Sequence, residues 1–168
     1  MTQKSRILIA VGLIVLIVSL VLGLEVLRRQ RSVLTRAGDE VVLQPGSIPI
    51  YVDGSLAAGF TPEGLGELET VSFVDDEDGK TQEGWMLRDV LGLYLNTAAL
   101  DSDASIMVSS SSREKSVTLT WAEVDDPVNW VMFDVSGRGT LKLVSVLERL
   151  DVRDEWVQDV DKIGVVTR

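Results

Sequence analysis

Apolar and polar positions divide the chain into two parts. Residues 7–24 contain no charged side chain and consist almost entirely of Leu, Ile, Val and small residues, so every face of a helix there would be apolar. At about 1.5 Å of rise per residue, such a helix spans roughly 27 Å, close to the thickness of the bilayer's hydrocarbon core. The pattern therefore predicts a membrane-spanning helix, and we assign residues 1–27 to a transmembrane anchor.

A cleaved signal peptide is the alternative interpretation of this segment. The apolar run is longer than a typical signal-peptide core, and no A-x-A-like cleavage site follows it. Glu25, Arg28 and Arg29 follow instead and end the hydrophobic stretch. These residues favour an anchor, and residues 28–44 are predicted to form a juxtamembrane stalk.

The basic residues that flank the span bear on its orientation. Lys4 and Arg6 precede it, whereas four arginines between residues 28 and 36 follow it. The positive-inside rule places the more basic flank in the cytoplasm, so this count slightly favours a cytoplasmic domain. A family resemblance described below favours the opposite orientation.

Beyond the stalk, short alternating runs are separated by turn residues, which is typical of strands. Residues 41–53 combine β-branched residues with prolines and indicate strand and loop. Asp78-Gly79 predicts a hairpin turn between two of the runs. The predicted strands are residues 70–74, 80–84, 105–109, 116–120, 130–135, 140–146 and 162–166.

Three short helices are predicted among these strands. Thr61 and Pro62 suit the N-cap and first position of one helix. Residues 85–95 place apolar side chains at helical spacing, and residues 121–124 form a short turn that ends before Pro127. The sequence thus predicts an α+β fold dominated by its sheet, in a domain that spans residues 45–168.

The composition excludes several kinds of chemistry. The chain has no Cys and no His, so it forms no disulfide, has no thiol nucleophile, and builds neither a Cys/His zinc site nor a Ser-His-Asp triad. Its net charge is −10, and because residues 1–31 carry +4, the remainder carries −14. An acidic domain repels phosphate backbones, so we expect no nucleic-acid partner.

Three motifs suggest chemistry, and each has a simpler interpretation. The acidic loop 75–79 fails as an EF-hand because Val74 and Trp85 take its first and last ligand positions. Residues 112–115 match S-x-x-K, but they precede a β-branched strand and lack the companion motifs. Neighbouring carboxylates at 125–126 and 151–155 are typical of a solvated surface. We therefore predict solvated loops, with no catalytic residue and no metal site.

The four tryptophans are expected to pack in the core with their indole N–H groups hydrogen-bonded. The alternative is an aromatic anchor in a groove that binds a partner. The helix that begins near residue 85 and the segment from 121 to 130 are the candidate contact surfaces. The candidate partner-binding residues are Trp85, Arg88, Trp121 and Trp130.

Five segments match motifs of one known protein family, in the same order along the chain. Residues 84–91 read GWMLRDVL, close to G-x-x-L-x-D-L-L, and residues 139–144 read GTLKLV, close to G-x-L-R-L-V. Residues 156–165 follow W-V-K-x-V-x-x-I-x-V, and segments 65–71 and 117–123 correspond to a helix before a strand and a strand before an acidic helix. This stretch resembles the molybdopterin-binding domain of sulfite-oxidase-type oxidoreductases.

The resemblance implies a sulfite-oxidase-like fold, and such relatives are often extracytoplasmic, so we expect the domain outside the cytoplasm. In that family a cysteine near the end of the first strand ligates molybdenum, but the matching stretch 71–75 contains none. Basic and imidazole groups that hold the pterin phosphate also lack counterparts. The resemblance therefore implies the fold in a degenerate form and not the activity.

Together these features predict a single-pass membrane protein whose domain is more consistent with a non-catalytic role than with an enzyme. It would act as an accessory or assembly subunit of a membrane complex, or as a ligand-sensing module. Its expected partners are the lipid bilayer and a membrane protein, with no cofactor, and the sequence identifies no small ligand. The alternatives are a molybdopterin-binding oxidoreductase domain with a degenerate metal site, and a structural spacer whose helix drives self-association.

Overall fold

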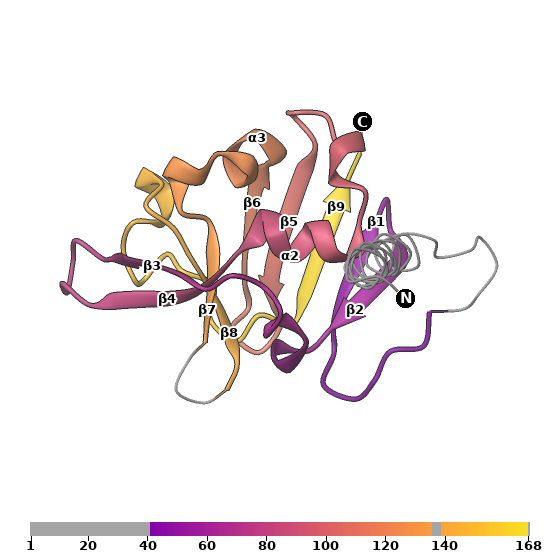
Figure 1. Ribbon diagram of the computed structural model, residues 1–168, viewed down its shortest axis with the longest axis horizontal. Coiled ribbons are helices and arrows are strands. Elements are labelled where there is room, and N and C mark those ends of the chain that lie inside the picture. Colours follow the sequence, from indigo (N-terminus) through magenta and orange to yellow (C-terminus); the bar gives the residue numbers. More distant parts are fainter. Residues whose placement is uncertain (1–40, 136–138, 168) are drawn as a thin grey trace, which may run out of the picture. The chain divides into compact units, whose positions relative to one another are not determined.

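The computed structural model describes residues 41–135 and 139–167, shown in colour in Figure 1. Within these ranges, nine strands form two sheets, and short helices connect them. This architecture confirms the predicted sheet-dominated α+β class. The predicted membrane anchor and most of the predicted stalk lie outside the described residues. No helix in the described part of the chain is long and apolar enough to span a membrane.

The larger sheet has the strand order β2-β1-β9-β5-β6. The C-terminal strand β9 lies at its centre, parallel to β1 and antiparallel to β5. Ile50, Ile106 and Ile163 project from three adjacent strands into the main core, where all three are fully buried. The bounds of the strands are β1 Ile48–Val52, β2 Ser55–Phe60, β5 Ser105–Ser110, β6 Lys115–Thr120 and β9 Lys162–Val166.

The β1–β2 hairpin was only half predicted, because β2 was not recognised. Asp53 and Gly54 join the strands in a two-residue turn, with Val52 paired to Ser55. Both turn residues have positive φ angles, 48° and 79°, as a type I′ turn requires. Asp-Gly between two apolar runs is a hairpin signal that the sequence contains and that our interpretation missed.

The smaller sheet has the strand order β3-β4-β7-β8. One of its faces adds Phe133, Leu141 and Leu143 to the main core, and the other face carries a second apolar cluster around Met132 and Trp156. The bounds are β3 Val71–Val74, β4 Thr81–Met86, β7 Met132–Val135 and β8 Leu141–Val144. Both faces of the smaller sheet thus carry apolar side chains.

The helices are short and connect the sheets. The prediction of a helix over 85–95 was wrong at its start, because Trp85 and Met86 belong to β4 and the Leu87 amide donates to the Val131 carbonyl at 2.9 Å. Figure 1 shows α2 crossing in front of the larger sheet. The helices are α2 Leu87–Tyr94 and α3 Trp121–Asp125, with 3-10 turns η1 Pro62–Leu65, η2 Thr97–Ala99, η3 Pro127–Asn129 and η4 Glu148–Leu150.

The acidic loop at residues 75–79 joins β3 to β4, and the prediction that it is solvated is wrong for Asp75. Asp75 is not solvated but only 2% exposed, and its carboxylate accepts from the Asp78 amide at 2.7 Å and from Gln82 Nε2 at 2.6 Å. The Asp78 amide is the main cause of a pKa below the usual range for Asp75. Lys142 Nζ continues this network, since it donates to Gln82 Oε1 at 2.7 Å and pairs with Asp134 at 2.8 Å.

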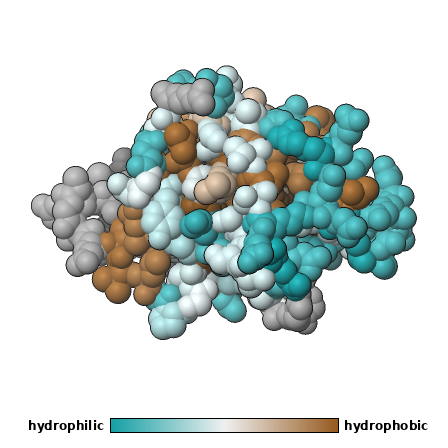
Figure 2. Space-filling view, turned by 180° about the vertical axis from the view of Figure 1, so that it is seen from behind, coloured by the Kyte–Doolittle hydropathy of each residue, from teal (hydrophilic) through white to brown (hydrophobic). Residues whose placement is uncertain are grey.

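Small and polar residues dominate the face of the larger sheet that lies away from α2. Tyr51, Met107 and Gly164 line a shallow depression there, and Met107 is partly exposed. Figure 2 shows this side, where hydrophobic and hydrophilic surface alternate over the middle of the sheet. Scattered exposed apolar side chains are usual on protein surfaces. We assign this face no function.

Candidate functional site

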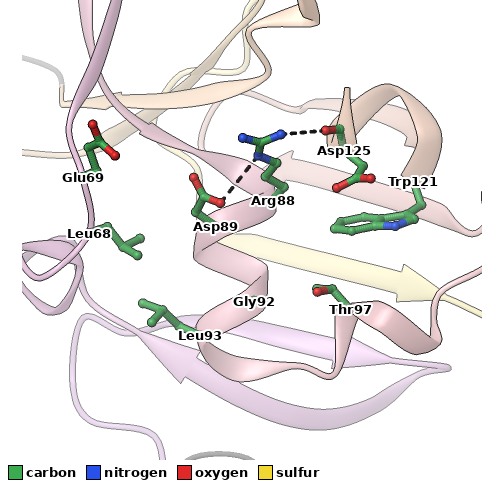
Figure 3. Close-up of a pocket in the computed structure, with 9 residues that line it drawn as sticks. All are labelled: Leu68, Glu69, Arg88, Asp89, Gly92, Leu93, Thr97, Trp121 and Asp125. Atoms are coloured by element: carbon green, nitrogen blue, oxygen red, sulfur yellow. Dashed lines mark hydrogen bonds and ion pairs between the residues drawn. The ribbon is translucent and has the colours of Figure 1, made fainter. Parts of the chain in front are cut away.

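A hollow of about 550 Å³ lies between the two helices and the segment that precedes β3. Its volume falls within the range of pockets that bind small ligands or anchoring side chains. Figure 3 shows its lining, which combines apolar, acidic and basic groups from four parts of the chain. The lining residues are Leu68, Glu69, Arg88, Asp89, Gly92, Leu93, Thr97, Trp121 and Asp125.

Helix α2 forms one wall because it is amphipathic. Leu87, Val90 and Leu91 are fully buried in the main core, which fixes the rotation of the helix. The residue after each buried leucine is rotated by about 100° around the helix axis, so Arg88 and Gly92 lie beside the buried face and line the hollow. Gly92 leaves space there, since a Cβ atom at this position would have only Thr97 Oγ1 nearby, at 3.9 Å.

Helix α3 forms the other wall, and a capping box fixes its start. The Thr120 hydroxyl accepts from the Glu123 amide at 3.3 Å, and the Glu123 carboxylate accepts from the Thr120 amide at 2.8 Å. Arg149 adds two hydrogen bonds to the same carboxylate, at 2.6 and 2.7 Å, and is the main cause of a pKa of about 2 for Glu123. These contacts fix helix α3, and Trp121 and Asp125 are its first and last residues.

Arg88 joins the two walls. Its Nη1 donates to the main-chain carbonyl of Asp125 at 2.9 Å, and its Nε lies 3.5 Å from the Asp89 carboxylate. Figure 3 shows the guanidinium between Asp89 on one side and Asp125 on the other. One cation thus faces three carboxylates, those of Glu69, Asp89 and Asp125, and the hollow carries a net negative charge.

Two of the four predicted partner-binding residues, Arg88 and Trp121, meet in this hollow. Trp85 and Trp130 do not line it. Trp85 packs against the main core, and its indole nitrogen is buried without a hydrogen-bond partner among the described residues. Trp130 adopts a left-handed conformation with φ of 46° and packs 5.9 Å from Phe73, beside the second cluster.

The prediction that all four tryptophans pack in the core is confirmed only in part. Trp121 and Trp156 are buried, with 8% and 2% of their surface exposed, and the Trp156 indole donates to the Leu150 carbonyl at 2.8 Å. Trp85 and Trp130 are half-buried. The expectation of a hydrogen-bonded indole therefore holds for Trp156 but not for Trp85.

Sequence reasoning missed most of the hollow's polar lining. Asp89 could have been found, because it follows Arg88 on the polar side of the predicted helix. Asp125 was considered only as one of a pair with Asp126, whose carboxylate instead accepts from the Val128 amide at 3.0 Å. Glu69 and Thr97 carry no local signal, since only the tertiary fold brings them to α2.

The S-x-x-K motif does not form a catalytic pair. Ser112 lies at the exposed tip of the β5–β6 hairpin, where its hydroxyl is 3.3 Å from that of Ser110. Lys115 Nζ instead hydrogen-bonds the main-chain carbonyl of Asp154. The interpretation of a polar hairpin loop is confirmed.

The stretch that matches the molybdenum-binding strand of the resembled family is β3 and the residue after it. Val71 and Phe73 pack against the second apolar cluster, and the Asp75 carboxylate is occupied by its hydrogen bonds to Asp78 and Gln82. No thiolate is present to ligate molybdenum, so these residues do not fit that group. Among the described residues, no set of three or more carboxylates is placed to hold a metal ion.

Comparison with protein-family models, curated proteins and solved structures finds no match for this chain. The resemblance to sulfite-oxidase-type domains therefore stays a prediction from the sequence.

Proposed function

We propose that this protein is a membrane-anchored accessory subunit whose acidic, non-catalytic domain binds a membrane protein partner through the hollow between α2 and α3. The observation that carries the proposal is the meeting of Arg88 and Trp121 in that hollow. Arginine and tryptophan are enriched among the residues that dominate binding energy at protein interfaces. Here they come from two different helices: Arg88 is held by its hydrogen bond to the Asp125 carbonyl, and Trp121 packs in the main core.

The membrane setting rests on the sequence. The uncharged run over residues 7–24 supports an anchor, and the resemblance to extracytoplasmic relatives supports a domain outside the cytoplasm. The positive-inside count points weakly the other way, so the proposal includes a topology test. A protease added to intact cells or spheroplasts should digest the domain only if it faces outward.

Gly92 gives the binding proposal a sharp experiment. Gly92→Leu fills the hollow without removing any polar contact, whereas Gly92→Ala leaves most of the space open and should stabilise α2 by up to about 1 kcal/mol. The full-length protein is purified from native membranes in mild detergent, and associated proteins are quantified by mass spectrometry. We expect one stoichiometric membrane partner with wild type and Gly92→Ala, and its loss with Gly92→Leu.

Two other outcomes would contradict the proposal. A partner retained equally by Gly92→Leu would exclude the hollow as the contact site. A protein that comes from membranes as a clean monomer would instead favour ligand sensing, and molybdenum and pterin analysis of the same sample would then test the oxidoreductase alternative. Circular dichroism of each variant confirms that the fold is retained.

A further inference from the structure

The hollow presents hydrogen-bond donors that the described residues leave unused. Trp121 is only 8% exposed, yet its indole nitrogen makes no hydrogen bond to the described part of the chain. In Figure 3 this nitrogen lies on the edge of the ring that faces Thr97, which also lines the hollow. Arg88 Nη2 likewise has no acceptor among the described residues. The Trp121 nitrogen is not among the buried unpartnered atoms and the Arg88 side chain is 32% exposed, so both donors are accessible to an occupant that supplies acceptor oxygens.

The rim of the hollow has more carboxylates than cations. Glu69 and Asp125 are exposed, and neither carboxylate pairs with a cation in the described ranges. Asp89 has only the Arg88 contact at 3.5 Å. The same sign of charge extends to the chain as a whole, at −10. A cationic group is therefore attracted both at long range and at contact.

Apolar surface lies between these two kinds of polar group. Leu68 and Leu93 line the same hollow, and Figure 3 shows both on the side of Glu69 and Asp89. Lysine and arginine have long apolar stems that pack on such surface while their charged ends reach carboxylates. A basic side chain thus matches the leucines and the acidic rim at once.

From these complementary features, and resting on the function proposed above, we propose that the occupant of the hollow is a peptide segment of the partner protein that carries a basic residue. The stem of that residue packs on Leu68 and Leu93, and its charge pairs with Glu69 and Asp89. Main-chain carbonyls beside it accept from the Trp121 indole and from Arg88. The site then recognises peptide backbone and positive charge together.

The test uses the full chain in nanodiscs of zwitterionic lipid, which do not attract basic peptides. The probe is a terminally blocked peptide of alternating glycine and lysine, and the readout is the NMR signal of the four indole N–H groups, with that of Trp121 assigned through Trp121→Phe. We expect saturable movement of the Trp121 signal. Matched probes are the same peptide with glutamate in place of lysine, and n-butylammonium.

The outcomes separate the possible occupants. The double variant Glu69→Gln/Asp89→Asn should weaken binding of the lysine peptide about fivefold or more, since each exposed charge contact contributes modestly. Equal binding of the glutamate peptide, or unchanged affinity of the double variant, would overturn the proposal. Binding of n-butylammonium as tight as that of the peptide would also overturn it, because a small amine would then suffice.

The membrane pull-down distinguishes this proposal from the function on which it rests. A partner lost with Gly92→Leu but retained with Glu69→Gln/Asp89→Asn would leave the accessory-subunit proposal intact and exclude a basic segment. A partner retained with both variants would exclude the hollow altogether. Loss with both supports the two proposals together.

Discussion

Gly84 lies where β4 runs closest to β7. A Cβ atom at this position would be 1.8 Å from the carbonyl oxygen of Phe133 and 2.8 Å from its carbonyl carbon. Main-chain atoms in the middle of a sheet have little freedom to move away, so only glycine fits. Gly84 therefore sets the close approach of these two strands, and β4 leads directly into α2.

We expect Gly84→Ala to lower the free energy of unfolding by at least about 2 kcal/mol, because the strands must separate to admit the methyl group. Gly66→Ala is the matched control. Gly66 has φ of −62°, and a Cβ atom there would be 3.5 Å from the nearest atom, so alanine should be neutral or slightly stabilising. Urea denaturation measures both, and equal stabilities would contradict the account.

Glu123 gives a prediction about pH. Its pKa is about 2 in the folded protein, below the usual 4.5, chiefly because Arg149 donates two hydrogen bonds to it. A lowered pKa stabilises the fold above pH 4.5, and this contribution is lost as the pH falls from 4.5 toward 2. Glu123→Gln should therefore cost about 1 kcal/mol at pH 7 and almost nothing at pH 2.

Thermal unfolding followed across this pH range measures the effect. Glu114→Gln is the control, since the Glu114 side chain lies exposed at the tip of the β5–β6 hairpin. A stability difference between wild type and Glu123→Gln that stays constant from pH 7 to pH 2 would show that the Arg149 contact does not act through the charge of Glu123.

Among the elements, the smaller sheet depends on a polar network that crosses three strands. Lys142 on β8 links Asp134 on β7, at 2.8 Å, with Gln82 on β4, at 2.7 Å, and its Nζ lies 4.9 Å from the centre of the Trp156 ring. The side chains of Lys142 and Asp134 are only 16% and 13% exposed. Removal of one charge would leave the other poorly solvated.

Lys142→Met should therefore destabilise the protein by about 3 kcal/mol, and Lys142→Met/Asp134→Asn should cost less than the single change. A double-mutant cycle in urea, with Asp134→Asn as the other single variant, measures the coupling between the two side chains. If the two changes were simply additive, the pair would not be coupled and the sheet would rely on apolar packing alone.

The elements that the sequence predicted well are those with a strong local pattern. β9 was predicted with the observed bounds, Lys162–Val166, and its Ile163 and Val165 are buried between less buried neighbours. The start of α2 was misplaced because Trp85 and Met86 fit the helical period as well as they fit β4, and only pairing with Phe133 and Met132 decides between them. The hollow could not be predicted, since its walls come together through the packing of α2 and α3 and not through any motif.

At the scale of the whole molecule, a predicted membrane anchor precedes an acidic domain that has a hollow of mixed polarity between α2 and α3. The anchor would hold the domain near a membrane partner and so raise the effective concentration of the partner's segment at the hollow. Arg88 and Trp121 would supply the anchoring contacts, and the acidic rim would select the charge of what binds.

The central claim is that the hollow contacts another protein in the membrane, and site-specific photo-crosslinking tests it most directly. A photoreactive residue is placed at Thr97, which lines the hollow, or at Thr118, an exposed position on β6 outside it, in the full chain in native membranes. We predict one discrete adduct from Thr97 that is absent from Thr118 and is lost when Gly92→Leu is added. The absence of an adduct from Thr97, or the same adduct from both positions, would contradict the account.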